Sequence, residues 1–153
     1  MITLTRTDSD NHDFITLVKL LDAELAELDG DEHVFYAQLN KTDKIKTVIV
    51  AYENARPISC GAIREYSPTI TEVKRMYTLP ESRGKGIATK ILIELEKWAS
   101  ELSYQKCILE TGLRQPGAIR LYKKNGYKRI SNYGKYAGIE NSVCFEKDIP
   151  KHT

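Results

Sequence analysis

The sequence predicts one mixed α/β domain whose mostly antiparallel sheet of six to seven strands carries helices on both faces. In the first half of the chain, three strand-like runs follow one another across short connections, which is typical of an antiparallel meander. In the second half, strand-like and helical runs alternate, and such a crossover gives a parallel strand pair. The 153 residues suffice for one core and leave no room for a second. We therefore expect a single domain over residues 1–153.

Hydrophobic periodicity defines the elements of the first half. Apolar residues recur at helical spacing from Phe14 to Leu28, and Gly30 is a typical helix end. The letters NARP at residues 54–57 are typical of a hairpin turn, although Pro57 leaves the start of the next strand open. The predicted elements are a strand at 2–6, a helix from Phe14 to Leu28, a second helix at 32–40, and strands at 46–53, 57–66 and 71–79.

The second half contains the strongest helix signal of the sequence. An apolar stripe from Ile87 to Leu102 predicts an amphipathic helix that ends near Ser103. A shorter helix has Pro116 near its start and Gly126 at its stop, as helices favour. The predicted elements of this half are the helix from Ile87 to about Ser103, a strand at 106–111, a helix at 116–126, and strands at 127–130 and 142–149.

Composition limits the classes of partner. The formal net charge of +2 is small and the basic residues are dispersed, so we expect neither a nucleic-acid nor a membrane partner. The N-terminus lacks the pattern of a signal peptide, and no apolar run approaches the ~20 residues that span a bilayer, which predicts a cytoplasmic protein. Cys60, Cys107 and Cys144 stand far apart in strand-like contexts, so we expect buried thiols rather than disulfides. The histidines have no metal-ligand spacing, and we expect no metal site.

The letters RGKGIA, residues 83–88, lie between a predicted strand and a predicted helix. Glycines let an anion approach the N–H groups at a helix start, where the helix dipole favours negative charge, and Arg83 and Lys85 add two cations. A nucleotide P-loop is not matched, because Ile87 stands where a lysine is needed, and Thr89 replaces the third glycine of a dinucleotide fingerprint. We therefore expect a phosphate-binding turn, the alternative being an exposed polar loop.

Two segments resemble a known family. The run EVKRMYTLPESRGKGIATKIL resembles motif A of the GCN5-related N-acetyltransferase (GNAT) family. The signature of that motif is [RQ]-x-x-G-x-[GA], and its three specified positions are here Arg83, Gly86 and Ala88. The run LETGLRQPGAIRLYKKNGYKRI is similar to the family's second acyl-CoA segment, and the order of predicted elements matches the fold of the family. The residues that match in the second segment are Ala118, Ile119, Leu121, Tyr122, Gly126 and Tyr127.

The resemblance implies a GNAT-type acyl-CoA N-acyltransferase fold and acetyl-CoA as cosubstrate. The pyrophosphate would lie on the turn at residues 83–88, and the pantetheine arm would pair with the strand at residues 76–78 as an added strand does. One departure is Gln115, because many members have Asn at this place. The cofactor-binding residues implied are Met76, Tyr77, Thr78, Arg83, Gly84, Lys85, Gly86, Ile87, Ala88, Thr89, Gln115 and Tyr122.

Acetyl transfer to an amine needs a neutral amine, a stabilised oxyanion and a proton for the departing thiolate. By the resemblance, the phenol of Tyr122 protonates the sulfur, its alternative being a packing role on the inner face of the helix. The resemblance also places the oxyanion at a main-chain N–H of residues 76–78. Glu72 is the candidate base, directly or through water. Its alternatives are a solvent-facing strand end, or a water relay without any dedicated base.

The sequence contains conflicting indications of the charge of the acceptor. An acidic run without basic residues would attract a cationic amine, whereas Arg64, Lys74 and Arg75 would favour a substrate with a carboxylate. A tyrosine- and amide-containing segment near the C-terminus is predicted to form part of the acceptor wall. The acidic run contains Asp22, Glu24, Glu27, Asp29, Asp31 and Glu32, and the C-terminal segment contains Asn132, Tyr133, Tyr136 and Asn141.

The function expected from these patterns is transfer of an acetyl group from acetyl-CoA to a primary amine of a small-molecule acceptor, directly in a ternary complex. Two alternatives stay open: a non-catalytic acyl-CoA-binding or regulatory domain, and a peptide or protein N-acetyltransferase. Dimerisation is common in such folds, so a homodimer is a further possibility, although no residue pattern fixes an interface.

Overall fold

The computed structural model describes residues 1–29 and 44–151, and the helix predicted at 32–40 lies outside these residues. The described residues form one mixed sheet of seven strands in the order β1-β2-β3-β4-β5-β7-β6. All neighbouring strands are antiparallel except β4 and β5, which are parallel, so the predicted meander and crossover are confirmed. The strands are β1 (Ile2–Thr7), β2 (Thr47–Glu53), β3 (Arg56–Ser67), β4 (Ile70–Thr78), β5 (Lys106–Gly112), β6 (Lys128–Ile130) and β7 (Ser142–Asp148).

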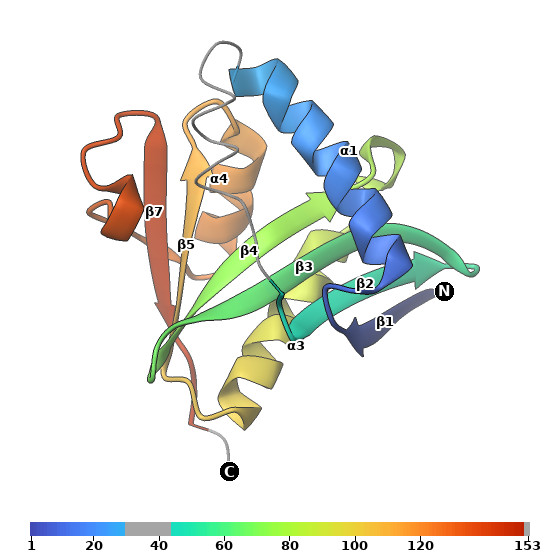
Figure 1. Ribbon diagram of the computed structural model, residues 1–153, viewed down its shortest axis with the longest axis horizontal. Helices are drawn as coiled ribbons and strands as arrows, with labels where there is room; N and C mark the ends of the chain where they lie inside the picture. Colours follow the sequence, from blue (N-terminus) through green and yellow to red (C-terminus); the bar gives the residue numbers. More distant parts are fainter. Residues whose placement is uncertain (30–43, 152–153) are drawn as a thin grey trace.

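Helices cover both faces of the sheet, as predicted. Figure 1 shows α1 in front of strands β2 to β4 and α3 behind them. In β2, the consecutive residues Val48–Ala51 are all fully buried. Because successive side chains of a strand point to opposite faces, this burial requires cover on both sides. The helices are α1 (His12–Asp29), α3 (Ile87–Glu101) and α4 (Pro116–Lys124), and 3-10 turns span Pro80–Ser82 and Gly134–Tyr136.

The core forms where the predicted apolar stripes meet the sheet. In α3, Ile91, Leu92 and Leu95 are fully buried, and in α1, Phe14 and Leu17 are buried. The three cysteines are buried and free, as predicted. Within residues 1–29 and 44–151, no helix combines the length and the apolar character needed to cross a membrane.

Strands β4 and β5 pair only at their beginnings. Their register runs from Ile70 opposite Lys106 to Glu72 opposite Ile108, and beyond these pairs the two strands separate (Figure 1). The later part of β4 keeps β3 as its neighbour on one side, but it has no strand partner on the other side among the described residues. The sheet therefore opens into a wedge at the carboxyl ends of its two central strands.

A β-bulge interrupts β4 next to this wedge. Cys60 of β3 is opposite Tyr77, whereas Ala62 is opposite Lys74, so β4 holds one extra residue there. Arg75, within the bulge, has a φ of 58°, which is rare for a residue with a side chain. A bulge re-aims the groups beside it, so the residues after Arg75 approach the wedge differently from a regular strand.

Gly61 of β3 allows this bulge to pack against α3. A Cβ at Gly61 would lie 2.4 Å from Met76 Sδ and 2.8 Å from Ile91 Cγ2. We expect Gly61→Ala to lower the free energy of unfolding by about 1–3 kcal/mol, because overpacking forces neighbouring side chains apart. Denaturant unfolding measures the effect. Gly117→Ala is the control, because a Cβ there would meet only Arg120 Nη2 at 3.8 Å. An unchanged midpoint for Gly61→Ala would contradict the close packing.

Candidate active site

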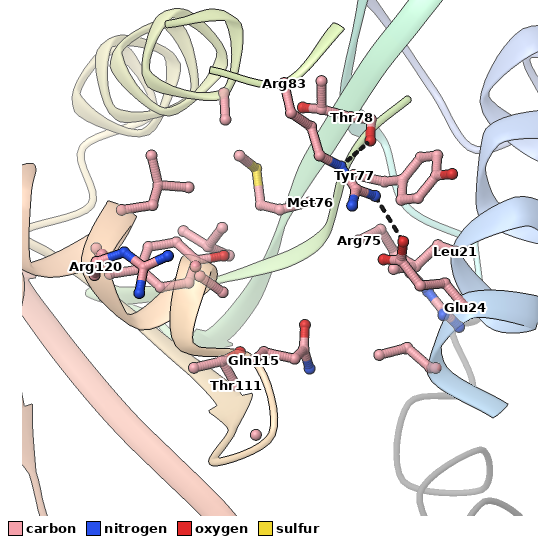
Figure 2. Close-up of a pocket in the computed structure, with 18 of the residues that line it drawn as sticks. Leu21, Glu24, Arg75, Met76, Tyr77, Thr78, Arg83, Thr111, Gln115 and Arg120 are labelled. Atoms are coloured by element: carbon pink, nitrogen blue, oxygen red, sulfur yellow. Dashed lines mark hydrogen bonds and ion pairs between the residues drawn. The ribbon is translucent and has the colours of Figure 1, made fainter. Parts of the chain in front are cut away.

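A cavity of about 940 Å³ fills the wedge between β4 and β5. Figure 2 shows its walls: α1 with Leu21 and Glu24 and the end of β4 lie on one side, and Gln115 and Arg120 lie on the other. The volume lies in the range of ligand pockets, which is about 300–1,000 Å³. The wedge between the two strands is therefore a ligand-sized cavity, and the bulge of β4 lies in its wall.

The glycine turn forms one end of the cavity. Gly84 and Gly86 have φ values of 78° and 80°, and Gly86 is the N-cap residue directly before α3. A Cβ at either glycine would meet nothing within 4 Å, so backbone conformation rather than crowding requires glycine here. The first N–H groups of a helix have no acceptor within the helix, and Ala88 and Thr89 of this first turn line the cavity. The turn thus has the arrangement of an anion site.

Arg83 points from the turn toward α1 (Figure 2). Its Nε donates to the carbonyl of Thr78 at 2.9 Å, and its Nη2 pairs with Glu24 Oε1 at 2.7 Å. The guanidinium also lies over the ring of Tyr77 at 5.6 Å. Lys85 is exposed and is not among the residues that line the cavity. One of the two cations predicted for the turn is therefore bound to a carboxylate, and the other lies outside the cavity wall.

Two basic residues of α4, Arg120 and Lys124, line the same cavity. The sequence analysis missed both, because their side chains reach the cavity only through the placement of α4 beside β5. Their spacing of four residues puts them on one helix face, which is the only sequence signal that could have found them. Together with the turn, they provide positive charge for an anionic ligand.

Tyr122 lies on the inner face of α4 and is 6% exposed. Its ring makes an edge contact with Tyr127 at 5.7 Å, and the residue also lines the cavity. Burial, followed by the charge of Glu110, raises the pKa of the Tyr122 phenol above its ordinary value. Tyr122 thus both packs on the inner face of α4 and forms part of the cavity wall. With its raised pKa, the phenol stays protonated at neutral pH.

Glu72 is buried, with 8% of its surface exposed, so the alternative of a solvent-facing strand end is wrong. The hydroxyl of Tyr133 donates to Glu72 Oε2 at 2.5 Å, and Lys74 Nζ lies 3.6 Å from Oε1. Burial lowers the pKa of the Lys74 ammonium, while Glu72 opposes that shift. Glu72 and Lys74 both line the cavity. The structure therefore places a buried charged pair in the wall.

The predicted pantetheine strand and the position of Gln115 face each other across the cavity. Met76, Tyr77 and Thr78 line the cavity along the edge of β4 that has no described strand partner. Gln115, directly before α4, lines the opposite wall (Figure 2). A polar side chain is thus present at the position where the sequence departs from the family pattern.

Two of the four residues named in the C-terminal segment lie in the cavity wall. Tyr136 and Asn141 line the cavity, whereas Asn132 donates to the carbonyl of Ile139 at 2.9 Å within its own segment. Glu110 was missed by the sequence analysis. It lines the cavity at the end of β5 and accepts a hydrogen bond from Ser142 at 2.8 Å.

Two residues of the acidic run pair with arginines of β4 and of the glycine turn. Asp22 pairs with Arg75 at 3.0 Å, and Glu24 pairs with Arg83 at 2.7 Å. Asp31 and Glu32 lie outside the described residues, as does the side chain of Asp29. Arg64 is exposed and is not among the residues that line the cavity, whereas Lys74 and Arg75 are. The structure thus brings together two of the three predicted cations.

The separated parallel strands, the unpaired β4 edge and the helix start together define a site for a long ligand with an anionic end. Residues 14–127 match the model of the Acetyltransferase (GNAT) family. The chain belongs to this family and is an acyltransferase, and the predicted fold and family are both confirmed. Among the described residues, no group of three or more His, Cys, Asp or Glu side chains could hold a metal ion.

Individual relatives cover nearly the whole chain. An IAA acetyltransferase of Azospirillum brasilense is 29% identical over 97% of this chain and 98% of that protein. The crystal structure of a Klebsiella pneumoniae protein provisionally named an acyl-CoA N-acyltransferase is 29% identical, with a TM-score of 0.82 over 97% of this chain and 98% of that one. A GNAT family acetyltransferase of Elizabethkingia anophelis, solved with acetyl-CoA bound, has the same fold at 16% identity, with a TM-score of 0.70 over 97% and 98% of the two chains.

Proposed function

We propose that this protein transfers the acetyl group of acetyl-CoA to a primary amine of a small-molecule acceptor, directly in a ternary complex. The observation that carries the proposal is the single cavity between β4 and β5, which joins an anion-binding turn to a buried carboxylate and a phenol. A relative solved with acetyl-CoA bound supports the choice of cosubstrate. The family membership supports acyl transfer over mere binding.

Acetyl-CoA supplies the acetyl group as a thioester, and the chain supplies binding and proton transfer. The N–H groups of residues 84–89 hold the pyrophosphate, and Arg120 and Lys124 add positive charge. The unpaired edge of β4 at residues 76–78 pairs with the pantetheine amides as an added strand does. A main-chain N–H beside the bulge donates to the thioester oxygen as charge develops there.

Proton transfers are assigned to two side chains. Glu72 accepts a proton from the acceptor ammonium through water, because its Oε2 is already occupied by the hydroxyl of Tyr133. The neutral amine attacks the thioester carbonyl, the carbon–sulfur bond breaks, and Tyr122 donates its phenolic proton to the departing sulfur, which leaves as a thiol. The second proton lost by the amine nitrogen returns to the phenolate of Tyr122 and restores the phenol. The raised pKa of Tyr122 keeps that proton in place at neutral pH.

Arg83 offers a direct test of the anion site. Because Glu24 holds its guanidinium, an incoming pyrophosphate must compete with that carboxylate. Glu24→Gln should therefore raise the affinity for acetyl-CoA by up to about fivefold, since a partly exposed ion pair contributes up to about 1 kcal/mol. Isothermal titration calorimetry measures the dissociation constant. Glu27→Gln, at an exposed neighbour outside the cavity wall, is the control, and a weaker affinity of Glu24→Gln than of this control would contradict the competition.

The proposed function is tested by calorimetric titration with acetyl-CoA, followed by thiol-release assays against polyamines, amino acids, aminoglycosides and peptides. Binding together with amine-dependent release of CoA supports the proposal. Binding without release on any amine favours a non-catalytic acyl-CoA-binding domain, and release only with peptides favours a peptide N-acetyltransferase. Absence of binding overturns the cavity assignment altogether.

A further inference from the structure

We infer that the acceptor is an amine that also carries a carboxylate, as an amino acid does, and that Lys74 binds this carboxylate. The inference rests on the proposed function and names the substrate class of the same cavity. Lys74 would then determine the specificity for the acceptor. The sequence alone left open whether its charge or that of the acidic run is the one that matters.

Lys74 is a buried cation in the wall of a ligand cavity. Its side chain is 5% exposed, and it lines the space between β4 and β5. Lysine is almost never fully buried unless it is paired, because its ammonium loses hydration. The ion-pair partner of Lys74 is Glu72, whose Oε1 lies 3.6 Å from Nζ, and Glu72 also accepts the hydroxyl of Tyr133. An ammonium has three donors, so a ligand carboxylate would complete its bonding without displacing Glu72.

The charges around Lys74 favour an anionic group of the ligand. Three cations, Arg64, Arg75 and Lys135, act electrostatically on the ammonium, whereas Glu72 is the carboxylate that acts on it. Asp22 offsets Arg75 by an ion pair on the α1 side. A ligand carboxylate placed beside Lys74 therefore meets more cations than carboxylates among the charges that act on this ammonium, which favours it over a second cationic group of a polyamine.

Within the described residues, the acidic run of α1 is a weak candidate for a competing site that binds a cationic amine. Its cavity-lining member Glu24 is bound to Arg83, and Asp22 is bound to Arg75. Before acetyl-CoA binds, a polycation would have to compete with two arginines for these carboxylates, and Asp22 keeps its arginine when the pyrophosphate engages Arg83. Of the two acceptor classes that the sequence suggests, the structure therefore favours the amine with a carboxylate over the purely cationic amine.

The spacing of Lys74 and Glu72 fits the two ends of an amino acid. The residues are two apart on β4, so their side chains leave the same face of the strand, and their charged atoms are 3.6 Å apart. The amine and the carboxylate of an α-amino acid are both attached to the same carbon atom, so they lie close together. With the carboxylate at Lys74, the amine lies beside Glu72, which is the base assigned to it above.

Matched acceptor pairs test the inference. Each of the common amino acids is compared with its methyl ester, and tyrosine, phenylalanine and histidine also with tyramine, phenethylamine and histamine, by thiol release at fixed acetyl-CoA. We expect kcat/KM for the best amino acid to exceed that of its carboxylate-free partner by tenfold or more. Equal or better use of the carboxylate-free amines would overturn the inference while leaving the proposed function intact. In the absence of turnover, calorimetric titration of the same pairs into the CoA complex applies the same criterion to binding.

Variants of Lys74 separate recognition from folding. Lys74→Gln should raise KM for the amino acid at least tenfold while leaving KM for acetyl-CoA within twofold, and Lys74→Arg should restore most of the loss. Lys97→Gln, at an exposed lysine of α3 outside the cavity, is the control. Thermal unfolding of each variant identifies a loss that is due to folding. Equal effects of Lys74→Gln on the amino acid and on its carboxylate-free partner would overturn the assignment of Lys74.

Discussion

Replacing Tyr122 with phenylalanine should lower kcat by about 10²–10³-fold, within the range expected for loss of a general acid. The ring of Tyr122 packs against Tyr127 and Phe145, and phenylalanine keeps these contacts. The loss should therefore appear in kcat, with KM for acetyl-CoA and the unfolding midpoint close to their wild-type values. Steady-state thiol release and thermal unfolding measure the two effects separately.

The pH dependence gives a second check on Tyr122. Burial raises the pKa of its phenol above the ordinary value of about 10, so the acid form persists as the pH rises to that value. Ionisation of Tyr122 should therefore not lower the wild-type rate between pH 8 and about 10. Any fall of the rate in this range should also be present in Tyr122→Phe. Tyr127→Phe is the matched control, because the hydroxyl of Tyr127 donates to Glu96 outside the cavity. A full rate for Tyr122→Phe would contradict the role of the phenol.

Glu72→Gln should both slow the reaction and destabilise the fold. The rate should fall by about 10²-fold or more if Glu72 accepts the ammonium proton. The free energy of unfolding should fall by up to about 3–5 kcal/mol, because removal of one partner leaves the buried charge of Lys74 without its carboxylate. Kinetics at saturating substrates and chemical denaturation give the two values.

The double variant Glu72→Gln with Lys74→Met separates these effects. Methionine is close to lysine in shape and removes the uncompensated charge, so most of the stability should return. The value of kcat at saturating acceptor should stay low, because the proton acceptor is still absent. Recovery of kcat together with stability would contradict the role of Glu72 as base and leave it a structural partner of Lys74.

The elements of the fold were predictable because their signals are local. The apolar stripe of α3 predicts that helix to within two residues of its end at Glu101, and the succession of helices and strands along the chain follows from hydrophobic periodicity and turn residues. The separation of β4 from β5 was not predictable, since it depends on how the strands pack on both helices. The bulge at Arg75 likewise depends on Met76 packing over Gly61, a contact between two strands.

The candidate site was predictable where it rests on backbone conformation and on the family pattern. Gly84, Gly86 and Tyr122 line the cavity as expected. The environment of Glu72 was not predictable, because its burial depends on Tyr133, which lies 61 residues away in the sequence. Ion pairs between separate elements, such as Arg83 with Glu24 of α1, also join residues whose proximity no local pattern indicates.

The most direct test of the central claim is mass spectrometry of the acceptor after turnover, with the released CoA measured in the same sample. Direct transfer should place one acetyl group on the amine nitrogen for each CoA released, and Tyr122→Phe should slow the formation of both products by the same factor. Release of CoA with no acetylated amine would mean that the cavity directs water to the thioester, and it would contradict transfer between two substrates held together.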